Sequence, residues 1–300
     1  MKYGGGMSEK IVSIITINYN GLKDTCEFID SLIEYETFPY ELIVVDNASE
    51  NDEAGKLQST YPEIRVICSE KNIGFAGGNN LGYCHASGFY ILYMNNDMIV
   101  KAPFLKPLVD RLKVSTAGIV SPKIKYSYAS DIIQYAGYTP MTSITIRNRA
   151  IGVREKDIGQ YDRAEKTAFA HGACMLTTKS VIEKAGKMTE IYFLFYEELD
   201  WCLQISRAGY TVWYEPASTV YHKESMTIER GSPARCYYLT RSRLLFARRN
   251  NFRISKLLSC FYQVMIVLPK NMLYYSFHMR WEMMTAIWRG TKRGLLDKCL

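Results

Sequence analysis

Four apolar, β-branched runs alternate with segments of helical periodicity over the first third of the chain. The runs are KIVSIITINYN (10–20), YELIVVDNASEND (40–52), IRVICSE (64–70) and YILYMNNDMIV (90–100). Between them lie KDTCEFIDSLIEYE, in which Asp24 is the expected helix cap, then EAGKLQSTY and the glycine-rich GFAGGNNLGYCHAS. Such alternation predicts parallel strands joined by right-handed crossovers, with helices on both faces. The fold class predicted for this half is an open, mostly parallel α/β sheet.

Polar residues, with Gly74 near one of them, lie at the end of each of the four runs or just after it. These are Thr16, Asn18 and Asn20, then Asp46 and Asn47, then Asn72 and Gly74, and finally Asn95, Asn96 and Asp97. Open α/β sheets bind ligands in the crevice outside the carboxyl ends of their strands, so we expect these residues to share one rim. One polar tip alone is also typical of a turn that satisfies its own backbone. Four tips on one edge favour a binding site.

Short motifs narrow the class of ligand. The cluster Gly74, Gly77, Gly78 and Gly82 lacks the G-x-G-x-x-G spacing, which disfavours a dinucleotide oxidoreductase, and no P-loop lysine pattern is present. The glycines either let the backbone approach a bulky ligand or pack a helix closely on the sheet. A carboxylate at a strand tip is typical of a site for a hard divalent cation that bridges phosphates, and Asp97 fits that role.

A family resemblance rests on seven motifs that occur in a fixed order. They are VSIITINYNG, ELIVVDNASEND, NIGFAGGNNLG, YMNNDM, GACMLTTKSVIEKAGKM, FYEELDWCLQISRAGY and VYHKES. Together they resemble the family 2 glycosyltransferases of the GT-A fold, close to the rhamnosyltransferase-like branch, over residues 10–250. The resemblance implies an inverting, metal-dependent transferase in surface polysaccharide synthesis. Its donor would be a nucleoside-diphosphate-sugar, with rhamnose as the branch-level expectation, and its acceptor a saccharide or lipid-linked saccharide.

The resemblance also assigns residues to the donor and the metal. Asp97 and His222 would hold Mg²⁺ or Mn²⁺, although a histidine taken alone is more often structural. The sequence departs from the family's D-x-D pattern because Asn95 stands at the first acidic position, so the donor diphosphate would supply much of the coordination. The expected nucleotide-sugar contacts are Thr16, Asn18, Asn20, Asp46, Asn47, Asn72, Gly74, Asn79, Asn95 and Asn96.

Three acids open a predicted helix within FYEELDWCLQISRAGY (195–210), which Gly209 ends. Acids at a helix N-terminus stabilise the helix, so Glu197 and Glu198 could have that role alone. The resemblance places Glu198 at the family's catalytic base, where an ionised carboxylate accepts the acceptor's proton. Asp200, which shares a helix face with Glu197, is the alternative. In AHGACML (170–176), the resemblance makes His171, Gly172 and Ala173 the acceptor side of the site.

The last fifty residues lie outside the resemblance and mix aromatic, aliphatic and basic side chains. We divide the chain into a transferase domain (8–250) and a C-terminal helical segment (251–300). The net charge is +7, and cations interleaved with apolar residues favour an anionic membrane surface over nucleic acid. The alternative is a helical cap that packs on the sheet or on a second subunit. The run LLSCFYQVMIVLP (257–269) is too short to cross a bilayer.

The eight cysteines form no C-x-x-C pair, and no signal peptide opens the sequence. We therefore expect free, mostly buried thiols in a reducing compartment, with the enzyme peripheral on the inner face of the cell membrane. Two other classes stay open. A sugar nucleotidyltransferase would carry a glycine-rich basic loop after its first strand, which NYNGLKDT hardly provides. A non-catalytic nucleotide or sugar-binding module could dispense with the acids at 197–200.

Overall fold

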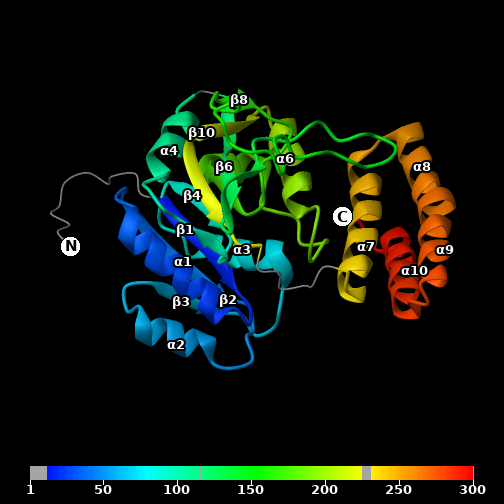
Figure 1. The fold of residues 1–300 in the computed structure, drawn as a ribbon, viewed down its shortest axis with the longest axis horizontal. Coiled ribbons are helices and arrows are strands. Elements are labelled where there is room, and N and C mark those ends of the chain that lie inside the picture. The colour runs from blue at the N-terminus through cyan, green and yellow to red at the C-terminus, as the bar shows by residue number, and fades with distance from the viewer. Residues whose placement is uncertain (1–11, 115, 225–230, 300) are drawn as a thin grey trace.

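A computed structural model describes residues 12–114, 116–224 and 231–299. Within these ranges the chain forms a ten-stranded sheet (Figure 1) with the order β3-β2-β1-β4-β9-β6-β10-β5, to which β7 adds beside β6 and β8 beside β10. The strands are β1 (Val12–Asn18), β2 (Tyr40–Asp46), β3 (Arg65–Cys68), β4 (Tyr90–Met94), β5 (Met98–Ile99), β6 (Ala117–Tyr126), β7 (Ala129–Tyr135), β8 (Glu165–Lys166), β9 (Cys174–Thr178) and β10 (Thr211–His222).

The sheet is mixed, and its first part is parallel as the alternating pattern predicts. β1 pairs in parallel with β2 and β4, and β2 with β3. β9 then runs antiparallel between β4 and β6, and β10 is parallel to β6. The run 90–100 is two strands instead of one, because the chain turns at 95–97 and β5 pairs antiparallel with the end of β10, with Met98 opposite His222. The predicted α/β class is confirmed.

Helices cover both faces of the sheet. Consecutive strand residues point to opposite faces, so each strand contributes side chains to the core on both sides. Ile14 belongs to the core cluster that includes residues of α1, α2 and α4, whereas Ile15 belongs to the cluster that includes residues of α3, α5, α6 and α7. Since α1 begins at Leu22, Asp24 lies in its first turn, and the predicted cap was wrong. The helices are α1 (Leu22–Tyr35), α2 (Glu53–Thr60), α3 (Gly74–Cys84), α4 (Leu105–Leu112), α5 (Lys179–Ala185), α6 (Glu197–Arg207) and α7 (Pro233–Asn250).

The C-terminal helices stand at one end of the molecule, far from α1 and α2 (Figure 1). They are α8 (Arg253–Tyr262), a π-helical turn η1 (Gln263–Val267), α9 (Leu268–Phe277) and α10 (Trp281–Leu296). α10 packs closely on α7, where a Cβ at Gly290 would lie 2.7 Å from the Tyr237 carbonyl oxygen. Leu245 and Phe246 of α7 join the core under the sheet, so α7 links the two parts.

Two predictions concerned the whole chain: that its apolar C-terminal run is too short to cross a bilayer, and that its cysteines are free and mostly buried. Among the described residues, none of the helices combines the length and apolar character that crossing a bilayer requires. All eight cysteines are free thiols, but only Cys174 and Cys202 are buried. The expectation of mostly buried thiols was wrong, because Cys68 lies on the edge strand β3 and Cys84 ends α3, and both side chains are exposed.

Candidate active site

The tips of β1 and β2 are tied together by the buried amide of Asn18. Its Nδ2 donates to Asp46 Oδ1 (2.9 Å) and Glu53 Oε2 (2.8 Å), and its Oδ1 accepts from Thr25 Oγ1 (2.7 Å). An amide has two hydrogens to donate, and both have acceptors inside the protein. Asn18 therefore supports the rim and has no free donor for a ligand.

Three other residues predicted to contact the donor lie beside the rim. Thr16 is fully buried in the sheet, and its hydroxyl has no hydrogen-bond partner within the described parts of the chain. Asp46 is 5% exposed and accepts from Asn18 and from the Ser49 backbone. Asn20 is exposed and accepts from the Glu50 backbone N–H (2.9 Å). Their contact with a donor stays a prediction.

The tip of β2 is joined to the start of α3 by a second amide network. Asn47 Nδ2 donates to Asn72 Oδ1 (3.0 Å), and Asn47 Oδ1 accepts from the Ile73 backbone N–H (3.0 Å). Gly74 adopts φ +75°, and a Cβ there would lie 2.3 Å from the Phe193 carbonyl oxygen. Glycine is needed because the loop before α6 comes so close to the backbone of α3.

The rest of the glycine cluster packs α3 on the sheet. A Cβ at Gly82 would lie 2.4 Å from Ile15 Cγ2, and one at Gly78 would lie 2.8 Å from Ile17 Cδ1. Of the two interpretations that the sequence left open, close helix packing accounts for these two glycines.

A cavity of about 410 Å³ opens at the rim and falls within the usual range for small-molecule sites. Of the residues predicted to contact the donor, six line it: Asn47, Asn72, Gly74, Asn79, Asn95 and Asn96. Seven lining residues were not predicted from the sequence: Ile17, Tyr19, Phe75, Met94, Phe193, Leu194 and Tyr238. Tyr19 and Met94 adjoin the polar tips and could have been found there, whereas nothing in the sequence connects Tyr238 of α7 with this edge.

Asp97 and His222 meet where β5 pairs with the end of β10. His222 Nε2 lies 3.1 Å from Asp97 Oδ1, and the Lys223 backbone N–H donates to the Asp97 carbonyl oxygen (3.0 Å). On the other side of the ring, His222 Nδ1 lies 2.8 Å from Gln134 Oε1, and Gln134 Nε2 donates to Glu224 Oε1 (2.8 Å). The donation to Glu224 fixes the Gln134 amide with its oxygen toward His222.

This hydrogen-bond chain determines what the Asp97–His222 pair can bind. Because Gln134 Oε1 only accepts, His222 Nδ1 carries a hydrogen, and the Nε2 lone pair then faces a carboxylate oxygen. Such a contact is favourable only when a proton or a metal cation lies between the two acceptors. A ring nitrogen oriented through its other N–H is the usual form of a metal-binding histidine. The pair therefore fits a divalent cation.

The protein offers few ligands to such a cation. In the described portion of the chain, no group of three or more His, Cys, Asp or Glu side chains is placed to hold a metal ion. A site with only two protein ligands, Asp97 and His222, is consistent with the sequence, because Asn95 stands where the family's D-x-D pattern has its first acid. The remaining coordination positions would belong to water and to ligand phosphates, as is common for Mg²⁺.

The segment 171–173 connects the Asp97–His222 pair with α6. The rings of His171 and His222 are 6.1 Å apart, the Asn95 backbone N–H donates to the Ala173 carbonyl oxygen (3.0 Å), and a Cβ at Gly172 would lie 3.3 Å from Glu198 Cγ. Burial and the neighbouring His222 lower the pKa of His171 to about 3, so the ring is neutral. The predicted metal, acceptor-side and base residues thus lie in one neighbourhood.

The three acids of α6 have different surroundings. Asp200 is 1% exposed and binds Arg249 Nε (3.0 Å) and Asn250 Nδ2, both from α7. Glu197 is buried, and its Oε2 has no hydrogen-bond partner in the described structure. Glu198 is half-buried, and its side chain packs against Gly172. Glu198 therefore contacts segment 171–173, whereas Asp200 contacts α7.

Burial raises the pKa of Glu198 above its usual value, although backbone N–H groups at the start of α6 oppose the change. For Glu197, burial and the charge of Glu198 raise the pKa much further. At both carboxylates the loss of hydration outweighs the field of the helix N-terminus. That Glu198 is ionised at neutral pH stays a prediction.

α7 holds the loop that leads into α6. Ser242 Oγ donates to the Leu194 carbonyl oxygen (2.9 Å), Arg243 Nε donates to Tyr196 Oη (2.8 Å), and Tyr238 stacks on Phe193 with ring centroids 4.9 Å apart. The loop is strained, since three of its non-glycine residues have positive φ: Phe193, Phe195 and Tyr196. Strained backbone is often found at functional sites and persists only where surrounding contacts impose it. These contacts come from α7.

Comparison with known proteins decides the family. Residues 13–186, more than half of the chain, match the family described as glycosyl transferase family 2. The chain belongs to this family. The resemblance seen in the sequence motifs is thereby confirmed at the level of the family, whereas its rhamnosyltransferase branch is indicated only by distant relatives.

Relatives of this family 2 glycosyltransferase include enzymes of glycan synthesis. It is 26% identical over 205 residues to the low-salt glycan biosynthesis hexosyltransferase Agl10 of Haloferax volcanii, covering 67% of this chain and 63% of that protein. It is 24% identical to the dTDP-rhamnosyl transferase RfbF of Shigella flexneri, covering 82% of each chain. It is 19% identical to the N-acetylglucosaminyl-diphospho-decaprenol L-rhamnosyltransferase of Mycobacterium tuberculosis, covering 73% and 78%.

Two solved structures share the fold. The mannosyltransferase PcManGT from Pyrobaculum calidifontis, in complex with GDP-Man and Mn²⁺, is 16% identical with a TM-score of 0.57, covering 96% of this chain and 87% of that one. GalNAc-T7 with UDP, GalNAc and Mn²⁺ is 13% identical with a TM-score of 0.66, covering 95% and 56%. The predicted GT-A architecture is confirmed by this likeness.

Proposed function

We propose that this family 2 member is an inverting glycosyltransferase that moves a sugar from a nucleoside-diphosphate-sugar to a hydroxyl of a glycan. The observation that carries the proposal is the meeting of the Asp97–His222 pair and Glu198 on either side of segment 171–173, next to the cavity at the rim. Rhamnose as the donor sugar rests on the two distant rhamnosyltransferase relatives.

Glu198 is the base that the surroundings of the three acids favour. Asp200 is held by Arg249 and Asn250, and Glu197 is only 3% exposed, so neither carboxylate is free to meet an acceptor. Glu198 packs against Gly172, where a Cβ would lie 3.3 Å from Glu198 Cγ, so the absence of a side chain at 172 makes room for the Glu198 carboxylate beside the acceptor-side segment. Its raised pKa makes the carboxylate a stronger proton acceptor, and an effective general base has a pKa near the working pH.

The proposed reaction is a single displacement. Glu198 accepts the proton of the acceptor hydroxyl while that oxygen forms a bond to the anomeric carbon. The bond from the anomeric carbon to the diphosphate oxygen breaks on the opposite face, and the diphosphate leaves with the electron pair, so the configuration inverts. Asp97 and His222 would hold Mg²⁺ or Mn²⁺, which when bound neutralises charge on the leaving diphosphate. Both solved relatives were captured with Mn²⁺.

The acceptor and the place of action are proposed together. We propose a saccharide or lipid-linked saccharide of a surface polysaccharide as the acceptor, with the enzyme peripheral on the inner face of the cell membrane. The glycan-synthesis relatives and the basic, aromatic C-terminal helices support this. A division at residue 250 into a transferase domain and a C-terminal segment is part of the proposal, although α7 contributes to both.

A panel of nucleotide-sugars tests the function. Release of a nucleoside diphosphate that depends on an acceptor and is lost with EDTA or with Asp97→Ala supports the proposed transfer. Consumption of pyrophosphate would instead show a sugar nucleotidyltransferase, and binding without turnover would show a non-catalytic module. Activity that survives both EDTA and Asp97→Ala would refute the metal assignment.

A further inference from the structure

The helical run α8–η1–α9 carries an unusual outer surface. Most of its exposed side chains are apolar, and nine of these follow helical spacing and are at least 43% exposed: Ile254, Leu257, Leu258, Phe261, Met265, Ile266, Leu273, Tyr274 and Phe277. Phe261 is 61% exposed and Phe277 85%. Single exposed apolar residues are common, but a contiguous row of this kind on a protein surface marks an interaction site. We call these nine residues the apolar face.

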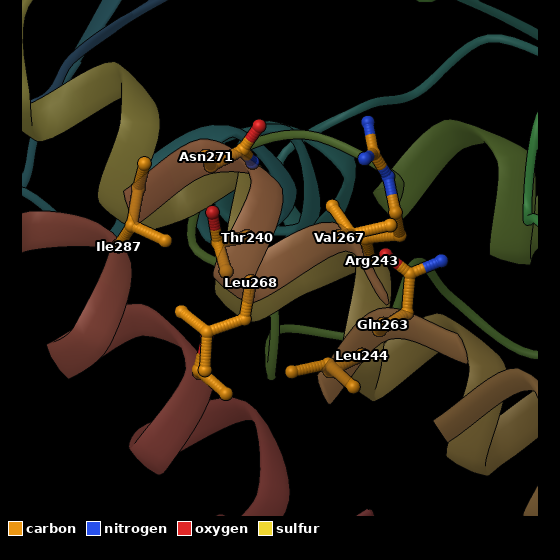
Figure 2. Close-up of a pocket in the computed structure, with 9 residues that line it drawn as sticks. Thr240, Arg243, Leu244, Gln263, Val267, Leu268, Asn271 and Ile287 are labelled. Atoms are coloured by element: carbon orange, nitrogen blue, oxygen red, sulfur yellow. The ribbon is translucent and has the colours of Figure 1, made fainter. Parts of the chain in front are cut away.

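The inner side of the same run carries amide side chains among its apolar ones. Gln263, Val267, Leu268 and Asn271 line a cavity (Figure 2) together with residues of α7 and α10. Its volume is about 20 Å³, which has room for one water. Gln263 Nε2 donates to the Thr145 carbonyl oxygen (3.1 Å). An ordinary surface helix places its polar side outward. This run is therefore built to have an apolar medium, and not water, on its outer side.

The positive charge of the C-terminal residues indicates which apolar medium contacts the apolar face. Residues 251–300 contain eight lysines and arginines and two acids, a formal +6 of the chain's +7. Both acids face arginines, since Asp297 binds Arg241 (2.7 Å) and Glu282 lies 3.4 Å from Arg280. Exposed cations flank the apolar face, namely Arg253, Lys256, Lys270 and Arg280. Apolar side chains bordered by cations are typical of helices that lie in the interface of an anionic membrane.

We propose that the apolar face lies in the plane of an anionic lipid surface, with α8, η1 and α9 parallel to the membrane and the flanking cations at its phosphates. A second copy of this chain is the less favoured occupant, because a symmetric contact would bring two surfaces of the same positive charge together. Figure 1 shows these helices at the end of the molecule away from α1 and α2, so the sheet domain does not cover them.

The docking surface rests on the membrane location in the proposed function and deepens it, and it does not depend on the proposed sugar transfer. Tyr238 of α7 lines the cavity, and the side of α7 lined by Thr240 and Leu244 faces η1 and α9. Docking would therefore hold the site near the bilayer, where a lipid-linked acceptor is concentrated. Vesicle binding is measured without donor or acceptor, so it can succeed when the proposed transfer fails, and the reverse.

The test is cosedimentation of the full chain with vesicles of phosphatidylcholine alone or mixed equally with phosphatidylglycerol. We expect binding to the anionic vesicles that weakens with salt. Phe261→Ser combined with Phe277→Ser should abolish it. The matched control is Ile158→Ser, which removes an equally exposed side chain (78%) from a distant loop and should bind like wild type. Lys256→Gln with Lys270→Gln should weaken binding about 30-fold at low salt, from about fivefold for each cation lost.

Unaltered circular dichroism and melting temperature would show that the variants fold, as expected for exposed positions. Wild-type protein that ignores anionic vesicles would overturn the proposal. So would a stable dimer that the double phenylalanine variant converts to monomer while neither protein binds lipid, since a second copy would then cover the face.

Discussion

Replacing Gly74 with alanine tests how the site is held together. At φ +75° an alanine is disfavoured by about 1–2 kcal/mol, partly offset by about 0.4–1 kcal/mol from a less flexible unfolded chain. The larger effect is steric. The new Cβ would start 2.3 Å from the Phe193 carbonyl oxygen, and that distance has to open to at least 3.0 Å.

The loop that must move carries the wall of the cavity and leads into Glu197 and Glu198. A displacement approaching 1 Å at reacting groups can lower the rate by about 10²-fold. We therefore expect Gly74→Ala to lower kcat/KM by about 10- to 100-fold, with the change measured as nucleoside diphosphate release.

Gly209→Ala is the matched control. Gly209 also has positive φ (+94°), but a Cβ there meets nothing within 4 Å. This variant should lose about 1 kcal/mol of stability from the backbone conformation alone and keep kcat/KM within about twofold of wild type. Equal melting temperatures and equal kcat/KM for the two variants would refute the reasoning, because the contact with Phe193 would then have no consequence.

Three further predictions concern residues behind the site. Burial holds the pKa of Glu197 well above its unfolded value near 4.5, so the stability that its protonated form contributes is present below pH 4.5 and is lost as pH rises toward the folded pKa. The unfolding free energy should therefore fall with pH by up to about 1.4 kcal/mol per pH unit, and Glu197→Gln should remove this slope. Urea unfolding at several pH values measures the slope, and an unchanged slope in the variant would contradict the prediction. Asn18→Ala should lower the unfolding free energy by about 2–4 kcal/mol, because the buried acceptors on Asp46 and Glu53 lose their donor, and a loss below about 1 kcal/mol in urea titration would count against it. Ser242→Ala, which frees the Leu194 carbonyl oxygen, should lower kcat several-fold in steady-state assays while nucleotide affinity in calorimetry stays close to wild type; equal kcat would show that α7 does not position the loop.

The sequence predicted the parts of the fold that local pattern determines. Ile14 and Ile15 point to opposite faces because side chains alternate along a strand, and this alternation is visible in the run 10–20. The antiparallel strand β9 and the split of the run 90–100 into β4 and β5 depend on pairing with distant segments, such as Met98 with His222. No local pattern specifies that pairing.

The same distinction holds at the site. The strand-end rule predicted that Asn47, Asn72, Asn95 and Asn96 share an edge, and they line one cavity. It could not separate residues that support the rim from residues that face the cavity. Asn18 was therefore predicted to contact the donor, although its amide donates to Asp46 and Glu53 within the protein. Tyr238 escaped notice because only tertiary packing brings α7 to that edge.

The anomeric configuration of the product tests the central claim most directly. With the donor identified, a time course by proton NMR should show a product whose anomeric configuration is opposite to that of the donor, formed by wild type. Glu198→Gln should form none while binding the nucleoside diphosphate with unchanged affinity, and Asp200→Asn should remain active if it folds. A product that retains the donor's configuration, or a Glu198→Gln enzyme as active as wild type, would contradict the account.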